Sequence, residues 1–461
     1  MTSSPSDVAK IDVVVLAAGK GTRMYSTKPK VLHTIGGKPM AQHVIDAAKR
    51  LGDVALHVVV GHQADLVSNS LQGAESFVEQ REQLGTGHAV AQVLPILRED
   101  AITLILYGDV PLIQTQTLER LVAGCSAQSM TLLTVTLDNP QGYGRICRNI
   151  DNEVTSIVEQ KDADSKQLLI NEVNTGIMCI QQSCLAAWLP LLSNTNAQNE
   201  YYLTDVVAMA VAQGIDVTSV DAPSPEEVEG VNNKLQLSAL ERCHQRRLAD
   251  ALMLAGTTLA DPGRVDIRGE LSVGRDVFID VNTVFSGNVT LGDNVSIGPN
   301  CVVSNSSIGD NTELLANCVV DQATLANDCV IGPFARLRPG STFAERSKVG
   351  NFVEVKNSSF GEGSKANHLA YVGDAQVGAG SNIGAGTITC NYDGANKHKT
   401  RLGKNVFIGS NSTLVAPLDI ADNGFVAAGS TIVKTVLADS LAVARGRQKN
   451  IEGWTRPSKK S

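Results

Sequence analysis

The sequence has few aromatic residues and no long apolar run. Phenylalanine, tryptophan and tyrosine make up 4% of its 461 residues, whereas glycine alone contributes 41. This composition favours thin, repetitive β architecture over a core built on bulky rings. No stretch reaches membrane-spanning length, and the first residues lack the basic and apolar segments of a signal peptide. We therefore expect a cytoplasmic protein with no membrane partner.

Paired cysteines and long basic segments are also missing. The nine cysteines form no C-x-x-C pair, which argues against a zinc ribbon and against a disulfide scaffold. The net charge is −8, and only a short tail from Arg445 onward is basic. This balance argues against nucleic-acid binding, so any anionic substrate needs a locally basic site.

The first half of the chain alternates between strand-like and helix-like segments. Strands are expected at Ile11–Leu16, 56–60, Ile102–Tyr107 and 130–136, and helices at 39–50, 88–97 and 117–123. This alternation predicts an α/β, Rossmann-like domain with a mostly parallel sheet and helices on both faces. Residues 233–254 read as a long linking helix that Gly256 ends. The predicted domains are 1–232, a linker at 233–256, and 257–461.

A six-residue repeat runs from about Val265 to Ile432. Aliphatic anchors begin at Val273, Ile279 and Phe285 and, after phase slips, end at Val426 and Ile432. A small residue, such as a cysteine, often lies four positions after the anchor. Three short strands per coil would place the anchors inside a triangular prism. We predict a left-handed parallel β-helix, with the hand taken from family resemblance and a mixed β-solenoid as the alternative.

The repeat has one large interruption, between Thr389 and Leu402. These residues break the period and must loop out of the coil. A long exposed loop on a rigid solenoid is a common place for function.

Two motifs of the first half combine glycine with charge. The segment from Leu16 to Met24, LAAGKGTRM, follows the first strand, and its glycines let backbone N–H groups face phosphates. Arg23 adds a planar cation and Lys30 a second one. Asp109 follows the strand Ile102–Tyr107, at the edge of the sheet where ligands bind. Each motif alone could equally be a simple turn.

Taken in full, this segment resembles the signature of sugar-nucleotide pyrophosphorylases, L-A-A-G-x-G-T-R-M followed by K-P-K. Gln80 to Gly87 looks like the uracil-recognising segment of uridylyltransferases. The resemblance implies phosphate contacts from Arg23 and Lys30, and Mg²⁺ ligands in Asp109 and Asn232. It implies nucleotide- and sugar-binding roles for Leu16, Ala17, Ala18, Gly19, Lys30, Gln80, Gly85, Thr86, Tyr107, Gly108, Asp109, Gly144, Glu159, Asn174 and Asn232.

The repeat carries its own charged residues. Arg338 and Lys356 lie one 18-residue interval apart, so they should stack on adjacent coils and could clamp one phosphate. The plainer alternative is two solvated charges. His368, Asn382 and the Asn391-Tyr392 pair follow.

These segments resemble the acetyltransferase half of the bacterial bifunctional enzymes that make UDP-N-acetylglucosamine, and both halves match in order over nearly the whole chain. The resemblance implies acetyl transfer from acetyl-CoA to glucosamine 1-phosphate, then uridylyl transfer from UTP to N-acetylglucosamine 1-phosphate. His368 would be the general base, with Glu354 orienting it. Sugar-phosphate contacts would come from Arg338, Lys356, Tyr371 and Asn382, and acetyl-CoA contacts from Ala385, Asn391, Tyr392, Ser410, Ala428 and Arg445. The family also implies a homotrimer.

Three alternatives remain open at this point. One is a single-activity pyrophosphorylase with a regulatory β-helix, and another is a non-catalytic assembly subunit with the same folds. The third, a zinc-dependent γ-class carbonic anhydrase, needs three histidine ligands, whereas the repeat region offers only His368 and His398.

Overall fold

A computed structural model describes residues 10–459, which divide into two compact units between His244 and Gln245. The division falls inside helix α8 (Lys234–Leu254), the helix expected at 233–254. The predicted limits of the domains stay a prediction. Among residues 10–459, no helix has both the length and the apolar character needed to cross a bilayer.

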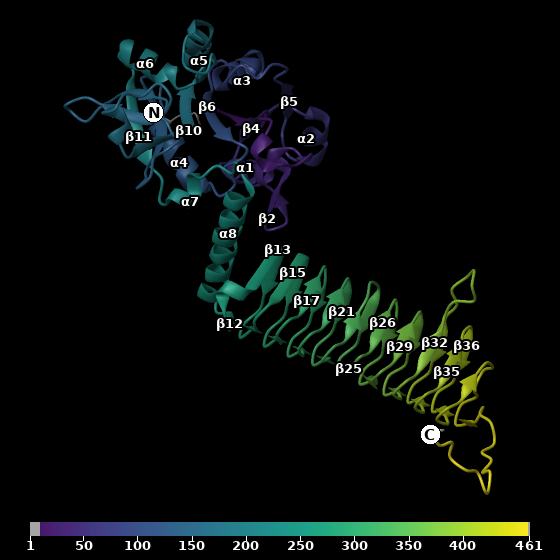
Figure 1. Cartoon of the computed structure of the whole chain (residues 1–461). Coiled ribbons are helices and arrows are strands. Elements are labelled where there is room, and N and C mark those ends of the chain that lie inside the picture. The colour runs from purple at the N-terminus through teal and green to yellow at the C-terminus, as the bar shows by residue number, and fades with distance from the viewer. Residues whose placement is uncertain (1–9, 460–461) are drawn as a thin grey trace, which may run out of the picture. The chain divides into compact units, whose positions relative to one another are not determined.

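The first unit is built on a nine-stranded sheet in which β11-β7-β10-β6-β1-β4-β5 lie side by side (Figure 1). All neighbours on this path are parallel except β10, which runs antiparallel to both β6 and β7. The mostly parallel sheet is therefore confirmed, with one reversed strand that the apolar pattern did not indicate. The strands are β1 (Ile11–Leu16), β4 (Val54–Val60), β5 (Ser76–Glu79), β6 (Ile102–Tyr107), β7 (Ser129–Thr136), β8 (Arg145–Arg148), β9 (Val154–Val158), β10 (Glu172–Gln181) and β11 (Asp216–Asp221), with a small hairpin of β2 (Thr34–Ile35) and β3 (Lys38–Pro39).

Helices cover both faces of this sheet because its central strands are apolar on both sides. In β1, Val13 and Val15 join the core formed with α1, α2 and α4, whereas Val14 and Leu16 join the core formed with α3, α5 and α6. The helices are α1 (Met40–Lys49), α2 (Ala64–Ser70), α3 (Thr86–Val93), α4 (Thr115–Gly124), α5 (Gln182–Trp188), α6 (Asp205–Ala212) and α7 (Pro225–Val228). Short 3-10 turns include η1 (Thr22–Met24) and η2 (Lys30–Leu32).

The second unit is a stack of short parallel strands, as the left-handed parallel β-helix requires. One column of eleven strands begins at β12 and ends at β39, and the remaining seventeen pair through the other faces. The strands are β12 (Thr258–Leu259), β13 (Val265–Val273), β14 (Phe278–Ile279), β15 (Thr283–Leu291), β16 (Ser296–Ile297), β17 (Val302–Ser304), β18 (Ser307–Ile308), β19 (Glu313–Leu314), β20 (Val319–Asp321), β21 (Ala323–Leu325), β22 (Val330–Ile331), β23 (Arg336–Leu337), β24 (Ser341–Phe343), β25 (Lys348–Asn351), β26 (Glu354–Lys356), β27 (Ser359–Phe360), β28 (Lys365–His368), β29 (Tyr371–Gly373), β30 (Ala375–Val377), β31 (Asn382–Ile383), β32 (Ile388–Cys390), β33 (Thr400–Leu402), β34 (Phe407–Ile408), β35 (Thr413–Val415), β36 (Leu418–Ile420), β37 (Phe425–Val426), β38 (Thr431–Ile432) and β39 (Leu441–Ala442).

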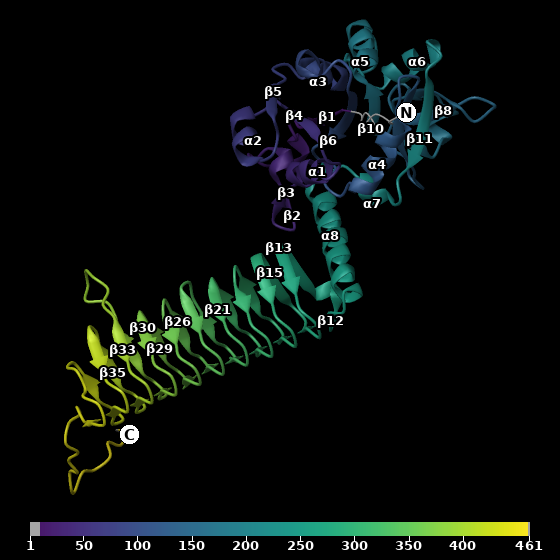
Figure 2. The same cartoon turned by 180° about the vertical axis from the view of Figure 1, so that it is seen from behind.

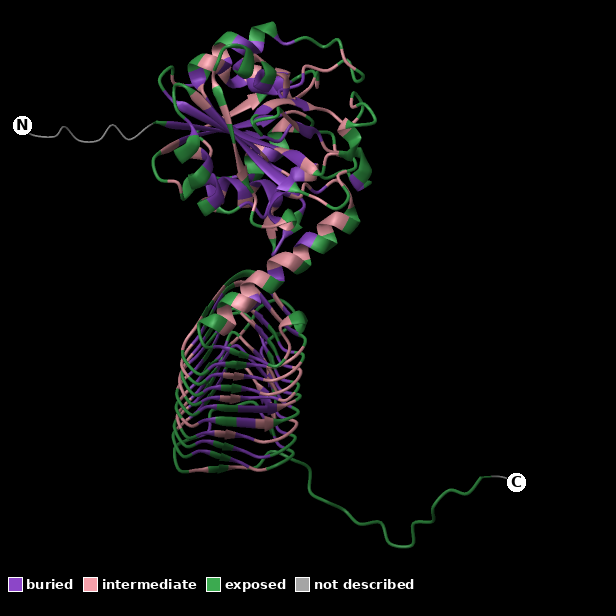
Figure 3. Ribbon diagram, turned by 90° about the vertical axis from the view of Figure 1, so that its left-hand side faces the viewer, coloured by how far each residue is buried: buried purple, intermediate pink, exposed green. Residues whose placement is uncertain are grey.

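The predicted anchors form the interior of this stack, which Figure 3 shows as buried segments inside each coil. Every anchor from Ile279 to Ile432 is buried, and Val273, in the first coil, is half-buried against the same core. Cys301, Cys318 and Cys329 are buried too, as small fillers of the coil. Asparagine and aspartate recur at corners with positive φ, for example Asn300 and Asp328, because their short polar side chains tolerate the left-handed region.

The interruption of the repeat projects out of the stack between β32 and β33, as both Figure 1 and Figure 2 show. Partners on neighbouring coils are usually 17 or 18 residues apart, as for Ile297 with Leu314. Across the interruption Ile383 pairs with Ile408, so the interval grows while the pairing is kept. The predicted loop is confirmed, and the coils on either side of it stay in register.

Candidate active sites

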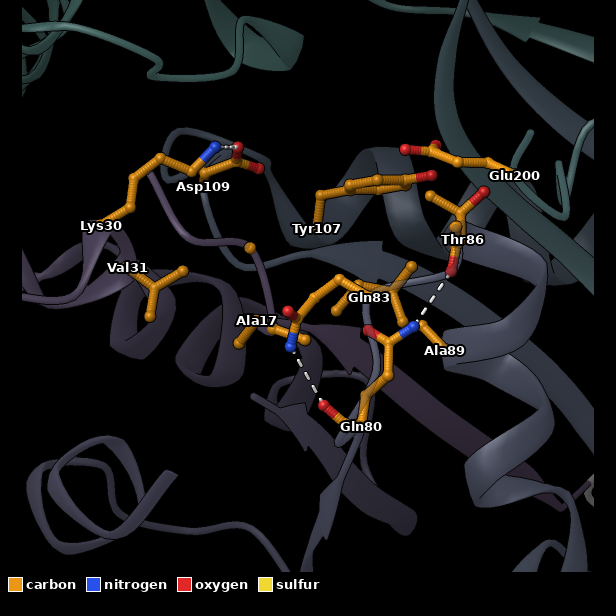
Figure 4. Close-up of a pocket in the computed structure, with 14 residues that line it drawn as sticks. Ala17, Lys30, Val31, Gln80, Gln83, Thr86, Ala89, Tyr107, Asp109 and Glu200 are labelled. Atoms are coloured by element: carbon orange, nitrogen blue, oxygen red, sulfur yellow. Dashed lines mark hydrogen bonds and ion pairs between the residues drawn. The ribbon is translucent and has the colours of Figure 1, made fainter. Parts of the chain in front are cut away.

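The first candidate site lies at the carboxyl end of the central strands of the first unit. Its pocket, shown in Figure 4, is lined by Leu16, Ala17, Ala18, Gly19, Lys30, Val31, Gln80, Gln83, Gly85, Thr86, Ala89, Tyr107, Asp109 and Glu200. Ten of these were predicted as binding residues. Val31, Ala89 and Glu200 were not singled out, and Glu200 comes from a loop far along the chain that carries no sequence signal.

The glycine-rich turn holds Lys30 close to the strand ends. Gly21 has φ 61°, and a Cβ there would lie 2.6 Å from the Cβ of Lys30. Only glycine allows this approach without displacing the lysine. The Gly108 N–H donates to the carbonyl of Leu16 at 2.9 Å, which joins the ends of β1 and β6.

One wall of the pocket comes from the segment that resembles a uracil-recognition motif. Gln80 is 3% exposed, and its Nε2 donates to the carbonyl of Gly85 at 3.1 Å. Gly85 has φ 113°, and a Cβ there would lie 2.6 Å from the carbonyl oxygen of Tyr201. The backbones of Gly85 and Tyr201 therefore lie close together at this wall.

All four predicted phosphate and metal residues meet at one point. Lys30 Nζ contacts Asp109 Oδ2 and lies 3.3 Å from Asn232 Oδ1, so both oxygens face the same cation. Arg23 Nη2 donates to the same Asn232 oxygen at 3.0 Å. The Val231 N–H donates to the carbonyl of Asp109 at 2.9 Å, which ties the Asn232 segment to the end of β6.

The predicted sugar residues form a neighbouring group. The Asn174 N–H donates to the carbonyl of Gly144 at 2.9 Å, and a Cβ at Gly144 would lie 3.4 Å from Glu159 Oε2. Glu159 accepts a hydrogen bond from Thr204 Oγ1 at 3.1 Å, and burial raises the pKa of its carboxyl group. Burial also raises the pKa of the Tyr107 hydroxyl, and the charges of Glu159 and Asp109 raise it further. Tyr107 therefore stays a neutral phenol between the sugar residues and the phosphate residues.

The second candidate site lies on the β-helix. The register pairs Leu337 with Val355, so Arg338 and Lys356 stack on adjacent coils as the 18-residue interval predicted. Each cation contacts a carboxylate: Arg338 Nη1 lies 2.8 Å from Glu354 Oε1, and Lys356 Nζ lies 3.4 Å from Asp374 Oδ2. Tyr371 lies opposite Glu354 on the next coil.

The expected role of Glu354 in orienting His368 stays a prediction, because the two residues have different partners within the chain. Glu354 starts β26 and binds Arg338, whereas His368 ends β28 in register with Asn351. His368 Nδ1 lies 2.7 Å from Asn351 Oδ1. Fourteen residues fall short of a full coil, so Glu354 and His368 occupy different positions of the triangle.

Several predicted acetyl-CoA residues share one corner of successive coils. Backbone bonds join Leu369 to Gly386, Ala385 to Asn411, and Ser410 to Gly429, and Arg445 Nη1 donates to the carbonyl of Ala428 at 2.8 Å. His368, Ala385, Ser410, Ala428 and Arg445 therefore form one column, called here the corner column. Asn382 lies on the adjacent face, in register with Lys365. Asn391 and Tyr392 begin the projecting loop, where the Tyr392 hydroxyl donates to the carbonyl of Gly394 at 2.5 Å.

A zinc site of the carbonic-anhydrase kind finds no support. Within residues 10–459, no three His, Cys, Asp or Glu side chains are placed to hold a metal. His398 instead lies 2.7 Å from Asp393 Oδ2 inside the loop.

Comparison with known proteins agrees with this geometry. A family model described as a MobA-like NTP transferase domain matches residues 13–198, and one described as a GMPPB C-terminal domain matches residues 267–351. Among solved structures, a UDP-glucose pyrophosphorylase complexed with UDP-glucose aligns at 16% identity with a TM-score of 0.43, over 52% of this chain and 100% of that chain. This structural likeness is too low to support an argument.

Relatives in sequence cover both units. The bifunctional protein GlmU of Marinobacter nauticus is 56% identical over 98% of this chain and 100% of its own length. That of Saccharophagus degradans is 58% identical, again over 98% and 100%. Two of the alternatives, a single-activity pyrophosphorylase and a non-catalytic subunit, do not fit these relatives, because the relatives are named bifunctional and match over 98% of this chain. The chain belongs to the family of bifunctional GlmU proteins, and it is an enzyme that combines a uridylyltransferase with an acetyltransferase.

Proposed function

We propose that the second unit transfers the acetyl group of acetyl-CoA to glucosamine 1-phosphate, and that the first unit then transfers uridylyl from UTP to the product. The observation that carries the proposal is that one chain holds both a cation-lined phosphate pocket and a histidine-bearing column. The products are UDP-N-acetylglucosamine, pyrophosphate and coenzyme A.

In the uridylyl step, an oxygen of the sugar 1-phosphate attacks the α-phosphorus of UTP and pyrophosphate leaves. The nucleophile is already an anion, so the demand is for positioning and charge neutralisation rather than for a base. Lys30 and Arg23 supply cations beside the glycine-rich turn, and Gln80 and Gly85 form the wall proposed for the uracil ring. Gly144, Glu159 and Asn174 are proposed to hold the sugar.

The donor set at Asp109 and Asn232 fits Mg²⁺. The two oxygens already face one cation, the ammonium of Lys30, and a carboxylate with an amide oxygen suits a hard ion that takes its other ligands from phosphate and water. When bound, Mg²⁺ would neutralise charge on the phosphates. Asp109 and Asn232 would hold the ion, and the Lys30 ammonium beside them would add positive charge for the phosphates.

In the acetyl step, His368 takes a proton from the ammonium group of glucosamine 1-phosphate. The neutral amine then attacks the thioester carbonyl, the carbon–sulfur bond breaks, and coenzyme A leaves as the thiol after protonation. Because an amide oxygen only accepts, the contact with Asn351 Oδ1 places the ring proton on Nδ1 and leaves Nε2 as the base. Arg338 and Lys356 are proposed to bind the phosphate, with Tyr371 and Asn382 beside the sugar.

The corner column suits a long ligand. Its five residues occupy successive coils, and four coil steps span about 19 Å at the usual strand spacing. Among residues 10–459, the Ser410 N–H donates to no protein acceptor, so it is available to the oxyanion of the thioester carbon. Acetyl-CoA is proposed to lie along this column and under the loop of Asn391 and Tyr392.

The apolar side chains next to His368 support the proposed homotrimer. Phe334 and Phe352 stack at 5.2 Å and are 49% and 55% exposed, and Leu369 on the following coil is 60% exposed. An exposed apolar ladder of this kind favours burial against another protein surface. Because it borders the histidine, we propose that a second copy of the chain closes each acetyl-transfer site.

With UTP and acetyl-CoA as co-substrates, the proposed location is the cytoplasm.

Replacing Asn351 with alanine tests the orientation of the histidine. Asn351→Ala is expected to lower kcat for acetyl transfer by about tenfold, because the imidazole loses the partner that holds its tautomer and its rotamer. The measurement is steady-state acetylation of glucosamine 1-phosphate, with Asn288→Ala, an exposed asparagine of β15, as the matched control. An unchanged kcat in Asn351→Ala would remove this role.

The whole proposal is tested by a coupled reaction. Glucosamine 1-phosphate, acetyl-CoA, UTP and Mg²⁺ together are expected to yield UDP-N-acetylglucosamine. Omission of acetyl-CoA should stop the sequence before the nucleotide sugar forms, and N-acetylglucosamine 1-phosphate should restore it. Formation of the nucleotide sugar without any release of coenzyme A would reject the acetyl-transfer half.

A further inference from the structure

Both ends of the projecting loop meet one residue, Asp374, which lies between β29 and β30. The Asn391 Nδ2 amide donates to Asp374 Oδ2 where the loop leaves the coil. The Thr400 N–H donates to the Asp374 carbonyl at 3.2 Å where the loop returns. Asp374 therefore closes the base of the loop with its side chain and its backbone.

The same carboxylate also reaches the coil below. Lys356 Nζ lies 3.4 Å from Asp374 Oδ2, and Asn357 Nδ2 lies 2.5 Å from Oδ1. The Asp374 side chain is only 7% exposed, and a buried carboxylate is stable only when its oxygens are hydrogen-bonded and its charge is paired. Burial raises the pKa of this carboxyl group. The hydrogen bonds from Asn357 and Asn391 and the charge of Lys356 lower the pKa by more than burial raises it, so the net shift is downward.

A lysine of the loop is also close to this pair. Lys356 lowers the pKa of Lys397, and the charge of Asp374 raises the pKa of both lysines.

Backbone geometry restricts what can replace Asp374. Its φ of 51° lies in the left-handed region, which asparagine and aspartate tolerate best. On its N-terminal side, a Cβ at Gly373 would collide with the Tyr371 hydroxyl. Asparagine therefore keeps the backbone and the shape at position 374 and removes only the charge and one acceptor.

We propose that Asp374 is a positioning residue for acetyl transfer, holding the Lys356 ammonium and the Asn391 amide at a fixed distance from each other. The inference rests on the proposed function, in which Lys356 binds the sugar phosphate and Asn391 contacts acetyl-CoA. A single carboxylate then sets the spacing of the two substrates. The role is indirect, because the Asp374 carboxylate is buried and its oxygens contact Lys356, Asn357 and Asn391.

The test is Asp374→Asn in the full chain. The KM values for glucosamine 1-phosphate and for acetyl-CoA are both expected to rise about tenfold, since each substrate loses a residue held by a charge-assisted bond. Uridylyl transfer by the same preparation is expected to be unchanged. Asp328→Asn is the matched control: Asp328 is also a corner residue, with φ 59°, and its carboxylate accepts from Asn311 at 3.2 Å.

A second pair of variants tests the shared carboxylate if Asp374→Asn does not fold. Asn391→Ala is expected to raise the KM for glucosamine 1-phosphate as well as that for acetyl-CoA. Lys356→Gln is expected to raise the KM for acetyl-CoA as well as that for glucosamine 1-phosphate. Effects confined to one substrate in both variants would overturn the inference, as would unchanged KM values in Asp374→Asn. Absence of acetyl transfer by the unaltered chain would instead reject the proposed function, and the inference with it.

Discussion

Asp109→Asn is expected to lower uridylyl transfer by about 10²-fold or more and to leave acetyl transfer unchanged. The substitution keeps the shape of the side chain and removes the charge that faces Lys30 and Asn232. It weakens the proposed Mg²⁺ site and leaves the Lys30 ammonium, 13% exposed, without its counter-ion. Both losses act on the phosphates that must be held during the attack on the α-phosphorus.

The measurement is pyrophosphate release from UTP and N-acetylglucosamine 1-phosphate, with acetyl transfer assayed on the same preparation. Asp46→Asn is the control, because Asp46 Oδ2 pairs with Lys38 at 2.6 Å in the same unit and has no proposed role in the site. A variant at position 109 that transfers uridylyl at the normal rate would disprove the site. Loss of both activities would indicate unfolding rather than a local effect.

His368→Ala is expected to have the converse effect: acetyl transfer falls by about 10²- to 10⁴-fold and uridylyl transfer is kept. The exposed ring at the start of the corner column has its Nδ1 held by Asn351, which leaves Nε2 to take the proton of the amine. Without a base, most of the amine stays protonated at neutral pH and cannot attack the thioester.

Coenzyme A release, followed with a thiol reagent at several pH values, measures this effect. The loss should be smaller at high pH, where the amine of the substrate is already deprotonated. His398→Ala removes the other histidine of this unit, which pairs with Asp393 in the loop, and is expected to keep most of the acetyl transfer. Normal acetylation by His368→Ala would refute the role of the histidine.

Much of the fold followed from local patterns. The apolar runs at β1 and β6 predicted both strands with their observed ends, because a strand buried on both faces must be apolar throughout. The direction of β10 could not be predicted, since an apolar run of residues has the same composition in either direction.

Within the sites, regular spacing was informative and irregular contacts were not. The interval between Arg338 and Lys356 predicted their stacking because each coil repeats nearly the same number of residues. Glu354 was expected to orient His368, whereas His368 contacts Asn351 within the chain. Glu200 reaches the pocket of the first unit from a loop without any pattern that indicates it.

Periodicity and local motifs predicted the two architectures, the projecting loop and most of the residues that line the candidate sites, with the hand of the β-helix taken from the family resemblance. The hydrogen-bond partners became visible only in the folded chain: Lys30 with Asp109 and Asn232, His368 with Asn351, and Asp374 with both ends of the loop. Such pairings depend on the rotation and stacking of coils and strand ends in three dimensions, which a linear spacing does not contain.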